Sequence, residues 1–234
     1  MYYYELALLK SPLNNLTYKS ENEIKIGTKV KVKLQQRKIL NEAVVIKQVE
    51  KPSFKCSDIL EITNEYFDEK MLQIATFVSL YYVCSLGEAL SVYHCFDRNI
   101  VKIFDEEKFD SQITLSDKQK EAKIFLDEKR QALLFANTGA GKTEIYIKII
   151  EEHLNQKKQA LLLMPEISLT PQMQKRLEKV FGKSVAIWHS KITKKKKEEI
   201  LKGLQEGSIK LIAGARSALF LPYLDLGVIV VDEE

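Results

Sequence analysis

Residues 136–143 read Ala-Asn-Thr-Gly-Ala-Gly-Lys-Thr, a spacing that suits the binding of a phosphate chain. Glycine adopts backbone conformations that a side chain blocks, so several N–H groups around Gly139 and Gly141 can point at one anion. Lys142 would reach the β- and γ-phosphates, and the Thr143 hydroxyl would bind Mg²⁺. The predicted phosphate-binding residues are Thr138, Gly139, Ala140, Gly141, Lys142 and Thr143. The alternative is a glycine-rich turn followed by a chance Lys-Thr pair.

A second group of charged residues follows an apolar stretch, where Val228–Val231 leads into Asp232-Glu233-Glu234. In a parallel sheet, ligands bind at the carboxyl ends of the strands. Asp232 would hold the hydrated Mg²⁺, and Glu233 would accept a proton from, or orient, the water that attacks the γ-phosphate. An acidic loop after a buried strand is common by itself. Together with the glycine loop upstream, it predicts binding of a nucleoside triphosphate with Mg²⁺.

Short apolar stretches alternate with amphipathic segments from residue 115 onward. The predicted strands are 132–135, 160–164, 185–188, 209–213 and 228–231. Near-continuous apolar strands alternating with helices indicate a parallel sheet covered on both faces. Residues 115–234 are therefore predicted to form an α/β domain that carries the glycine loop and the acidic strand end.

The N-terminal part has a different pattern. Lys29-Val30-Lys31-Val32-Lys33-Leu34 alternates strictly, which places Lys29, Lys31 and Lys33 on one face of a strand. Strand geometry aligns these charges, so the face is a candidate DNA contact. An ordinary solvated face is an equally good interpretation. The run at 194–197 precedes acidic residues and is interpreted as the solvated start of a helix.

Four segments are predicted: a β-rich basic module (1–55), a helical segment (56–96), a linker (97–114) and the α/β domain (115–234). The chain of 234 residues has a net charge of +4, with acidic residues in excess only over 56–110. Basic zones on either side fit a polyanionic partner.

The sequence also points to the compartment. The three cysteines, Cys56, Cys84 and Cys95, form no Cys-x-x-Cys pair, so we expect free thiols in a reducing compartment and no zinc site in this chain. No apolar run approaches about 18 residues and no signal peptide is evident, so a cytoplasmic protein without membrane contact is expected.

Several motifs together resemble a known helicase family. The Ala at position 136 and the Asp-Glu-Glu strand end are typical of superfamily 2 helicases with a DEAH box. More narrowly, "TGAGKTEIY", "LLLMPEISLTPQ", "WHS", "GARSALF" and "LGVIVVDEE" resemble the PriA family of primosomal replication-restart helicases. The resemblance is strong over 115–234. It is looser over 1–96, where "GTKVKVKL" and "FVSLYYVCSLGEAL" carry it.

The resemblance implies a RecA-like first helicase lobe behind a small DNA-binding domain. It implies an ATP-dependent 3′→5′ DNA helicase that recognises stalled or abandoned replication forks and starts primosome assembly. The implied cofactors are ATP and Mg²⁺. The implied partners are forked and single-stranded DNA, other primosome proteins and single-strand-binding protein.

Individual residues take expected roles from the same resemblance. Gln119 is placed where the family reads the edge of adenine, which a Gln amide suits because it both donates and accepts; a surface glutamine at a helix start is the alternative. Thr170, Arg216 and Ser217 lie in segments that line the single-strand track. Arg216 could equally pair with a carboxylate.

The resemblance also implies that the β domain holds the 3′ end of a nascent strand. The corresponding stretch here includes Thr17 and Tyr18, with Thr where Asp often stands. A threonine hydroxyl can still hydrogen-bond the terminal sugar.

The sequence stops just before the His that usually completes the DEEH box. The second motor lobe, its arginine finger and the family's zinc-binding cysteines are expected beyond it. Motor lobes open and close around ATP, so these residues alone are expected to bind ATP and DNA but turn ATP over poorly. The alternatives are a nucleotide-gated DNA-binding module without unwinding activity and, more weakly, a small-molecule kinase.

Overall fold

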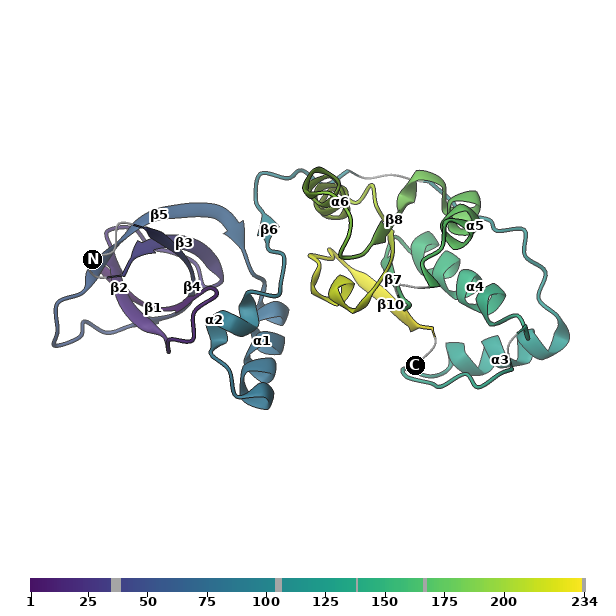
Figure 1. Cartoon of the computed structure of the whole chain (residues 1–234), viewed down its shortest axis with the longest axis horizontal. Coiled ribbons are helices and arrows are strands. Elements are labelled where there is room, and N and C mark those ends of the chain that lie inside the picture. The colour runs from purple at the N-terminus through teal and green to yellow at the C-terminus, as the bar shows by residue number, and fades with distance from the viewer. Residues whose placement is uncertain (35–38, 104–106, 138, 166–167, 233–234) are drawn as a thin grey trace. The chain divides into compact units, whose positions relative to one another are not determined.

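The computed structural model describes residues 1–34, 39–103, 107–137, 139–165 and 168–232 (Figure 1). The chain forms two compact units. The first is Met1–Val101 with Phe220–Pro222, and the second is Lys102–Leu219 with Tyr223–Glu234. The predicted linker, 97–114, is thus divided between the units after Val101. Over the described ranges, no helix combines the length and the apolar character needed to cross a membrane.

The first unit is built on a closed β-barrel. Its strands are β1 (Tyr2–Leu8), β2 (Leu16–Ser20), β3 (Thr28–Lys33), β4 (Leu40–Val49), β5 (Ser57–Tyr66) and β6 (Phe96–Asp97). They follow the order β2-β1-β4-β3-β5-β6, and a parallel pairing of β2 with β5 closes the ring. Figure 1 shows β1 to β5 around the barrel axis. The other pairings are antiparallel, which confirms the predicted β-rich N-terminal region.

The barrel interior follows from alternation along the strands. In β3, Val30 and Val32 are fully buried and join a core that includes Tyr4, Leu6 and Val45. Lys29, Lys31 and Lys33, which alternate with these valines, point to the opposite face because successive side chains of a strand alternate. A single strand therefore supplies both barrel core and a row of cations.

Two helices follow the barrel strands: α1 (Glu69–Tyr82) and α2 (Leu86–Leu90). The Asp68 carboxylate accepts from the Met71 N–H and caps α1, whereas Ser85 and Glu88 form a capping box at α2. Helices in this part of the chain were predicted. The strand β5 was not, because its alternation is broken by Asp58, Glu61 and Asn64.

The second unit contains a four-stranded parallel sheet. Its strands are β7 (Gln159–Leu163), β8 (Val185–Trp188), β9 (Leu211–Gly214) and β10 (Leu226–Val231), in the order β10-β7-β9-β8. Its helices are α3 (Asp117–Asp127), α4 (Lys142–Asn155), α5 (Pro171–Phe181) and α6 (Lys194–Glu206), with 3₁₀ turns η2 (Gly182–Ser184) and η3 (Arg216–Phe220). Parallel strands alternating with helices confirm the predicted α/β class.

The two faces of this sheet are covered by different helices. On one face, Leu162 and Ala213 pack with Ile147 and Ile150 of α4 and with Phe181 of α5. On the other, the Lys197 ammonium of α6 lies 5.8 Å from the centroid of the Trp188 ring. The two central strands, β7 and β9, are accordingly buried along their whole length, as their continuous apolar runs predict, whereas β8 and β10 are partly exposed.

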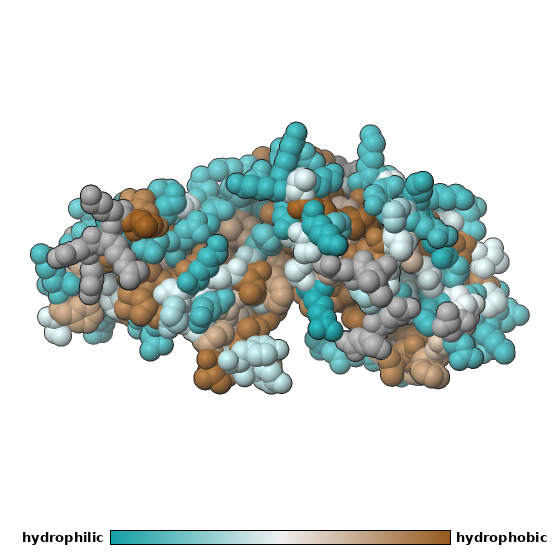
Figure 2. Space-filling model, viewed as in Figure 1, coloured by the Kyte–Doolittle hydropathy of each residue, from teal (hydrophilic) through white to brown (hydrophobic). Residues whose placement is uncertain are grey.

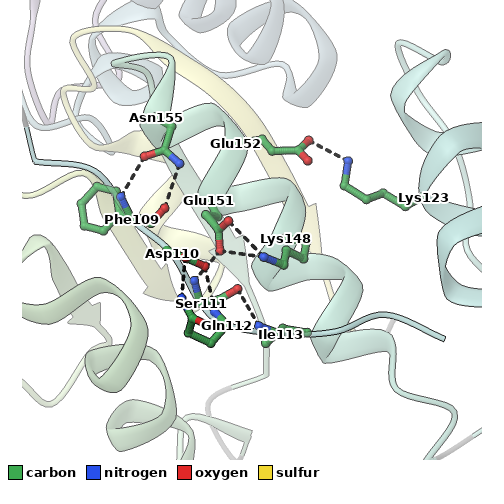
Figure 3. A network of polar contacts seen from close by, with 10 residues as sticks. All are labelled: Phe109, Asp110, Ser111, Gln112, Ile113, Lys123, Lys148, Glu151, Glu152 and Asn155. Carbon is green, nitrogen blue, oxygen red and sulfur yellow. Dashed lines mark hydrogen bonds and ion pairs between the residues drawn. The ribbon is translucent and has the colours of Figure 1, made fainter.

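The segment before α3 is attached to α4 by a polar network (Figure 3). The Asn155 side chain accepts from the Phe109 N–H at 2.9 Å and donates to its carbonyl at 3.0 Å. The Glu151 carboxylate accepts from the Ser111 N–H at 2.8 Å. Phe109 itself is buried in the sheet core. Residues placed in the predicted linker are therefore part of the packed second unit.

The predicted strand at 132–135 is wrong. These residues lie outside the sheet, and Leu133 and Phe135 are 90% and 91% exposed. The surface over α3 and the segment after it carries apolar, brown atoms in Figure 2. A strand needs a hydrogen-bonded neighbour, and the described residues place no strand against the outer edge of β10. Residues 132–135 have the composition of a strand, but among the described residues no neighbouring strand pairs with them.

Candidate nucleotide and nucleic-acid sites

One edge of the second unit's sheet collects most of the predicted site residues. Because β7 to β10 are parallel, their carboxyl ends share this edge. The helix α4 runs back across the sheet and leads directly into β7, so its N-terminus lies toward the same edge. The loop before α4 and the residues after the strands are thereby directed to one side, the usual ligand side of such sheets.

The glycine loop has the backbone conformation that its sequence predicts. Gly139 and Gly141 both have φ of 81°, in the left-handed region that glycine alone enters without strain. Gly141 is the N-cap of α4, and Lys142 is its first helical residue. The Lys142 ammonium donates to the Ala136 carbonyl at 3.0 Å, so the side chain folds back over its own loop.

This arrangement fits a phosphate chain. The first N–H groups of α4 have no partner within the helix, and the helix dipole favours an anion there. Within the described residues, no carboxylate pairs with Lys142, and its ammonium donates to a neutral carbonyl that leaves the positive charge uncompensated. Thr143 lies in the first turn and is half-buried. Ala140 is exposed, and Thr138 lies outside the described residues.

Gln119 lies beside this loop. Its Oε1 accepts from the Ser116 N–H at 2.8 Å in the capping box of α3, and its Nε2 donates to the Gly141 carbonyl at 3.1 Å. Gln119, which the family resemblance predicts to read adenine, therefore lies next to the phosphate loop. Its amide also has protein partners that the sequence did not indicate.

Asp232 follows β10 at the ligand edge. Its N–H donates to the Leu163 carbonyl at 2.8 Å, which keeps the start of the acidic segment paired with β7. Glu233 lies outside the described residues. Within the described ranges no group of three or more His, Cys, Asp or Glu side chains gathers in one place. One carboxylate, one hydroxyl and substrate phosphates are a common ligand set for Mg²⁺, which retains several waters.

The predicted single-strand track also begins at this edge. Thr170 is the N-cap of α5, where its hydroxyl accepts from the Met173 N–H at 3.2 Å. Arg216 and Ser217 open η3 directly after β9, and both are exposed. No carboxylate pairs with Arg216 in the part of the chain that the structure describes. Of the two interpretations left open for Arg216, the structural ion pair is not observed there.

An ion pair that the sequence did not reveal connects two helices at the same edge. The Arg176 guanidinium of α5 contacts the Glu144 carboxylate in the first turn of α4. The one sequence feature that could have indicated this ion pair is Glu144 in the first turn of a helix, where the helix dipole favours an acidic residue. This contact ties the helix of the phosphate loop to the helix that Thr170 caps.

The lysine face of the barrel is largely neutralised. The Lys29 ammonium is 2.8 Å from both Glu42 and Glu65, and its side chain is only 11% exposed. Burial by itself would lower the pKa of Lys29, but these carboxylates outweigh it and raise the pKa to about 12. Lys31 pairs with Glu61 at 2.8 Å. Lys33 is exposed and, among the described residues, makes no ion pair.

Cys95 completes this network. Its thiol lies 3.4 Å from the Glu65 carboxylate, and burial followed by the Glu65 charge raises the pKa of Cys95 to about 12. For Glu65, burial alone would raise the pKa, but the hydrogen bond and the charge of Lys29 lower it overall. The network holds β3, β4 and β5 together through charges on their outer face.

The predicted 3′-end stretch lies on β2. Tyr18 is 4% exposed, and its hydroxyl donates to the Lys33 carbonyl at 3.1 Å; burial raises its pKa. Thr17 pairs with Glu5 of β1 and is half-buried on the outer face of the barrel. Tyr18 therefore belongs to the barrel core, whereas Thr17 is accessible.

Comparisons with known proteins agree with both units. Residues 116–234 match the family described as DEAD/DEAH box helicase, and residues 7–94 match the PriA family described as 3′DNA-binding domain (3′BD). The replication restart proteins PriA of two Helicobacter pylori strains are 41% and 42% identical over 235 residues, covering 100% of this chain. That of Bacillus subtilis is 45% identical over 108 residues, covering 46% of this chain and 13% of the relative.

This chain spans 37% of the length of the two Helicobacter relatives. Within that span, the helicase match covers the sheet and the glycine loop, and the DNA-binding match covers most of the barrel and both of its helices. The chain belongs to the DEAD/DEAH box helicase family and, within it, to the group of replication restart proteins PriA.

Proposed function

We propose that this chain binds Mg-ATP with its second unit and DNA with its first. In the proposal it is the N-terminal part of an ATP-dependent 3′→5′ DNA helicase that recognises stalled or abandoned forks and initiates replication restart. One observation carries the nucleotide part: the glycine loop, with both glycines left-handed, and Asp232 belong to the same edge of a parallel sheet. The family match over residues 7–94 supports the DNA part.

In the proposed nucleotide site, each residue has one task. The Lys142 ammonium leaves the Ala136 carbonyl and donates to the β- and γ-phosphates. The Thr143 hydroxyl and the Asp232 carboxylate hold the metal, and Glu233 orients the attacking water. Bound Mg²⁺ supplies positive charge that stabilises the phosphates during transfer.

The proposed DNA contacts belong to both units. In the first, exposed Lys33 and accessible Thr17 contact a phosphate and the 3′-terminal sugar, with Lys31 weaker because of Glu61. In the second, exposed Arg216 and Ser217 contact the backbone of a single strand near the helix that Thr170 caps. These contacts recognise the backbone and do not read bases.

The wider role rests on the relatives. Forked and single-stranded DNA are the proposed substrates, and primosome proteins and single-strand-binding protein are the proposed partners. Such a protein works on the chromosome, so the cytoplasm is its proposed location. Residues 1–234 by themselves are expected to hydrolyse ATP slowly, since a helicase cycle needs a second lobe to close on the nucleotide.

Two titrations of residues 1–234 test the proposal. Fluorescent ATP is expected to bind in the presence of Mg²⁺ and to be released by a chelator. Forked DNA is expected to bind more tightly than blunt duplex, with an affinity that falls as salt rises. Failure to bind any adenine nucleotide would refute the nucleotide site, and equal affinity for fork and duplex would refute fork recognition.

A further inference from the structure

The side-chain amide of Gln119 connects two elements that are separate in the sequence, the start of α3 and the phosphate loop. Its Oε1 closes the capping box of α3 by accepting from the Ser116 N–H, and its Nε2 donates to the carbonyl of Gly141. A Gln amide offers two donors and two acceptor positions. The two used here come from the start of one helix and from the residue immediately before another. The side chain is a bridge between α3 and the phosphate loop.

The bridge requires glycine at position 141. A Cβ atom added to Gly141 would lie 2.1 Å from the Gln119 Nε2, far inside any allowed contact. The same residue has φ of 81° and caps α4. At Gly139, which has the same φ, an added Cβ would meet no atom of the described residues within 4 Å. Two separate constraints therefore exclude a side chain at position 141: the left-handed backbone conformation and the contact with the Gln119 amide.

The helix α3 depends on such polar contacts for its position. Its residues include no buried side chain. Near its middle, Lys123 pairs with Glu152 of α4 at 2.7 Å, as Figure 3 shows. Near its N-terminal end, the tie is the bond from Gln119 to Gly141. Two polar contacts, about one helical turn apart on α3, therefore fix the helix against α4 and the loop.

We propose that Gln119 is a positioning residue for the phosphate loop, acting independently of the base. By holding the Gly141 carbonyl, it fixes the peptide that immediately precedes Lys142, so that the Lys142 and Thr143 N–H groups stay directed toward a phosphate chain. The inference rests on the proposed nucleotide site. A positioning residue and an adenine reader can be distinguished by experiment. Loss of a positioning residue weakens the binding of a triphosphate that has no base, whereas loss of an adenine reader does not.

The experiment measures the affinities of residues 1–234 for Mg-ATP and for Mg-tripolyphosphate. Gln119→Met removes both amide bonds at similar size. Ser116→Ala removes the other half of the capping box but keeps the Gln119 bridge, and Lys123→Met removes the ion pair between α3 and Glu152 of α4. Loss of one neutral hydrogen bond predicts about a three- to tenfold loss of affinity. We expect this loss for both ligands in Gln119→Met and in neither of the controls.

The outcomes separate the alternatives. If Gln119→Met weakens ATP alone, the residue acts on the base and the inference fails. If neither ligand is affected, or if Ser116→Ala weakens both equally, the Gly141 bond does not position the loop. A thermal melt verifies that the variants remain folded at the assay temperature. If the unaltered chain binds neither ligand, the proposed nucleotide site itself is wrong, which is distinct from a failure confined to Gln119.

Discussion

Two lysines, one in each unit, show how differently the two parts of this protein use charge. Lys29 lies on the closed barrel, where carboxylates from two neighbouring strands contact it. Lys142 begins a helix beside an open sheet, where its ammonium donates to the neutral carbonyl of Ala136 and, among the residues that the structure describes, makes no ion pair. The ion pairs of Lys29 with two carboxylates stabilise the fold. The ammonium of Lys142, which is hydrogen-bonded to a neutral carbonyl, is available to pair with an anionic ligand.

The difference follows from topology. In the barrel, each of β1 to β5 has a neighbour on both sides, so charged residues on the outer face have cross-strand partners within reach. In the sheet, the loops after parallel strands leave at one edge, where side chains meet no facing strand. Closed sheets therefore tend to pair their surface charges, and strand ends of open sheets leave them available.

The largest effect is expected when the charge of Lys142 is removed. Lys142→Ala should lower the affinity for Mg-ATP by roughly a hundredfold, because charge-assisted contacts to two phosphates are lost. Fork binding by the barrel should be retained. Both are measured by titration with labelled ligands.

Lys148→Ala is the matched control. This lysine is on the same helix but pairs with Glu151, so its loss should leave ATP affinity unchanged. If Lys142→Ala abolished fork binding in a folded protein, or if both variants weakened ATP equally, the division of charges proposed here would be wrong.

The next effect concerns Lys29. Lys29→Met should destabilise the first unit by about 2 kcal/mol, because Glu42 and Glu65 lose their shared partner. Those carboxylates are 46% and 42% exposed, so water solvates them in part and keeps the cost below that of a fully buried pair. Urea unfolding measures the change. Lys33→Met, at an exposed lysine of the same strand, should change stability by less than about 0.5 kcal/mol, and equal costs would contradict the network.

A third effect compares the two left-handed glycines. Gly139→Ala should cost about 1 kcal/mol from backbone strain alone. Gly141→Ala should cost about 1 kcal/mol more, because its Cβ displaces Gln119 and breaks that hydrogen bond. Thermal unfolding of the second unit measures both. Equal melting temperatures for the two variants would show that the Gln119 bridge contributes nothing.

The smallest effect is the pH dependence of the barrel. The pKa of Glu65 is lowered from 4.5, so its stabilising contribution is present above about pH 4.5 and is lost as pH falls through the lowered pKa. The pKa of Lys29 is raised from 10.5 to about 12, so its contribution is present below pH 10.5 and is lost as pH rises toward 12. Urea midpoints below pH 5 should fall more steeply for the unaltered chain than for Lys29→Met. Parallel curves would mean that the two groups are not coupled.

Sequence patterns predicted local features well. The alternation from Lys29 to Leu34 marked β3, and the glycines at 139 and 141 have the left-handed backbone that a phosphate-binding loop uses. Both depend on short-range rules, namely the period of a strand and the conformations of glycine. The family resemblance, carried by contiguous motifs, was confirmed for the same reason.

Pairing between distant residues was not predictable in this way. Lys29 and Glu65 are far apart in the sequence, and no pattern around Lys29 indicates that a second strand neutralises it. Phe109 stands among polar residues that resemble a linker, yet Asn155 and the sheet core hold it. The apolar run at 132–135 has strand composition but no strand beside it. A periodic pattern indicates which face is apolar, and the partner depends on the rest of the chain.

The outer side of β10 has a practical consequence. Its backbone donors and acceptors face away from β7, and Ile229 and Val231 beside them are about half exposed. Such an edge is a template on which another polypeptide can add a strand. Preparations limited to these 234 residues are therefore expected to self-associate as concentration rises. A lysine introduced at position 229 should keep them monodisperse in light scattering.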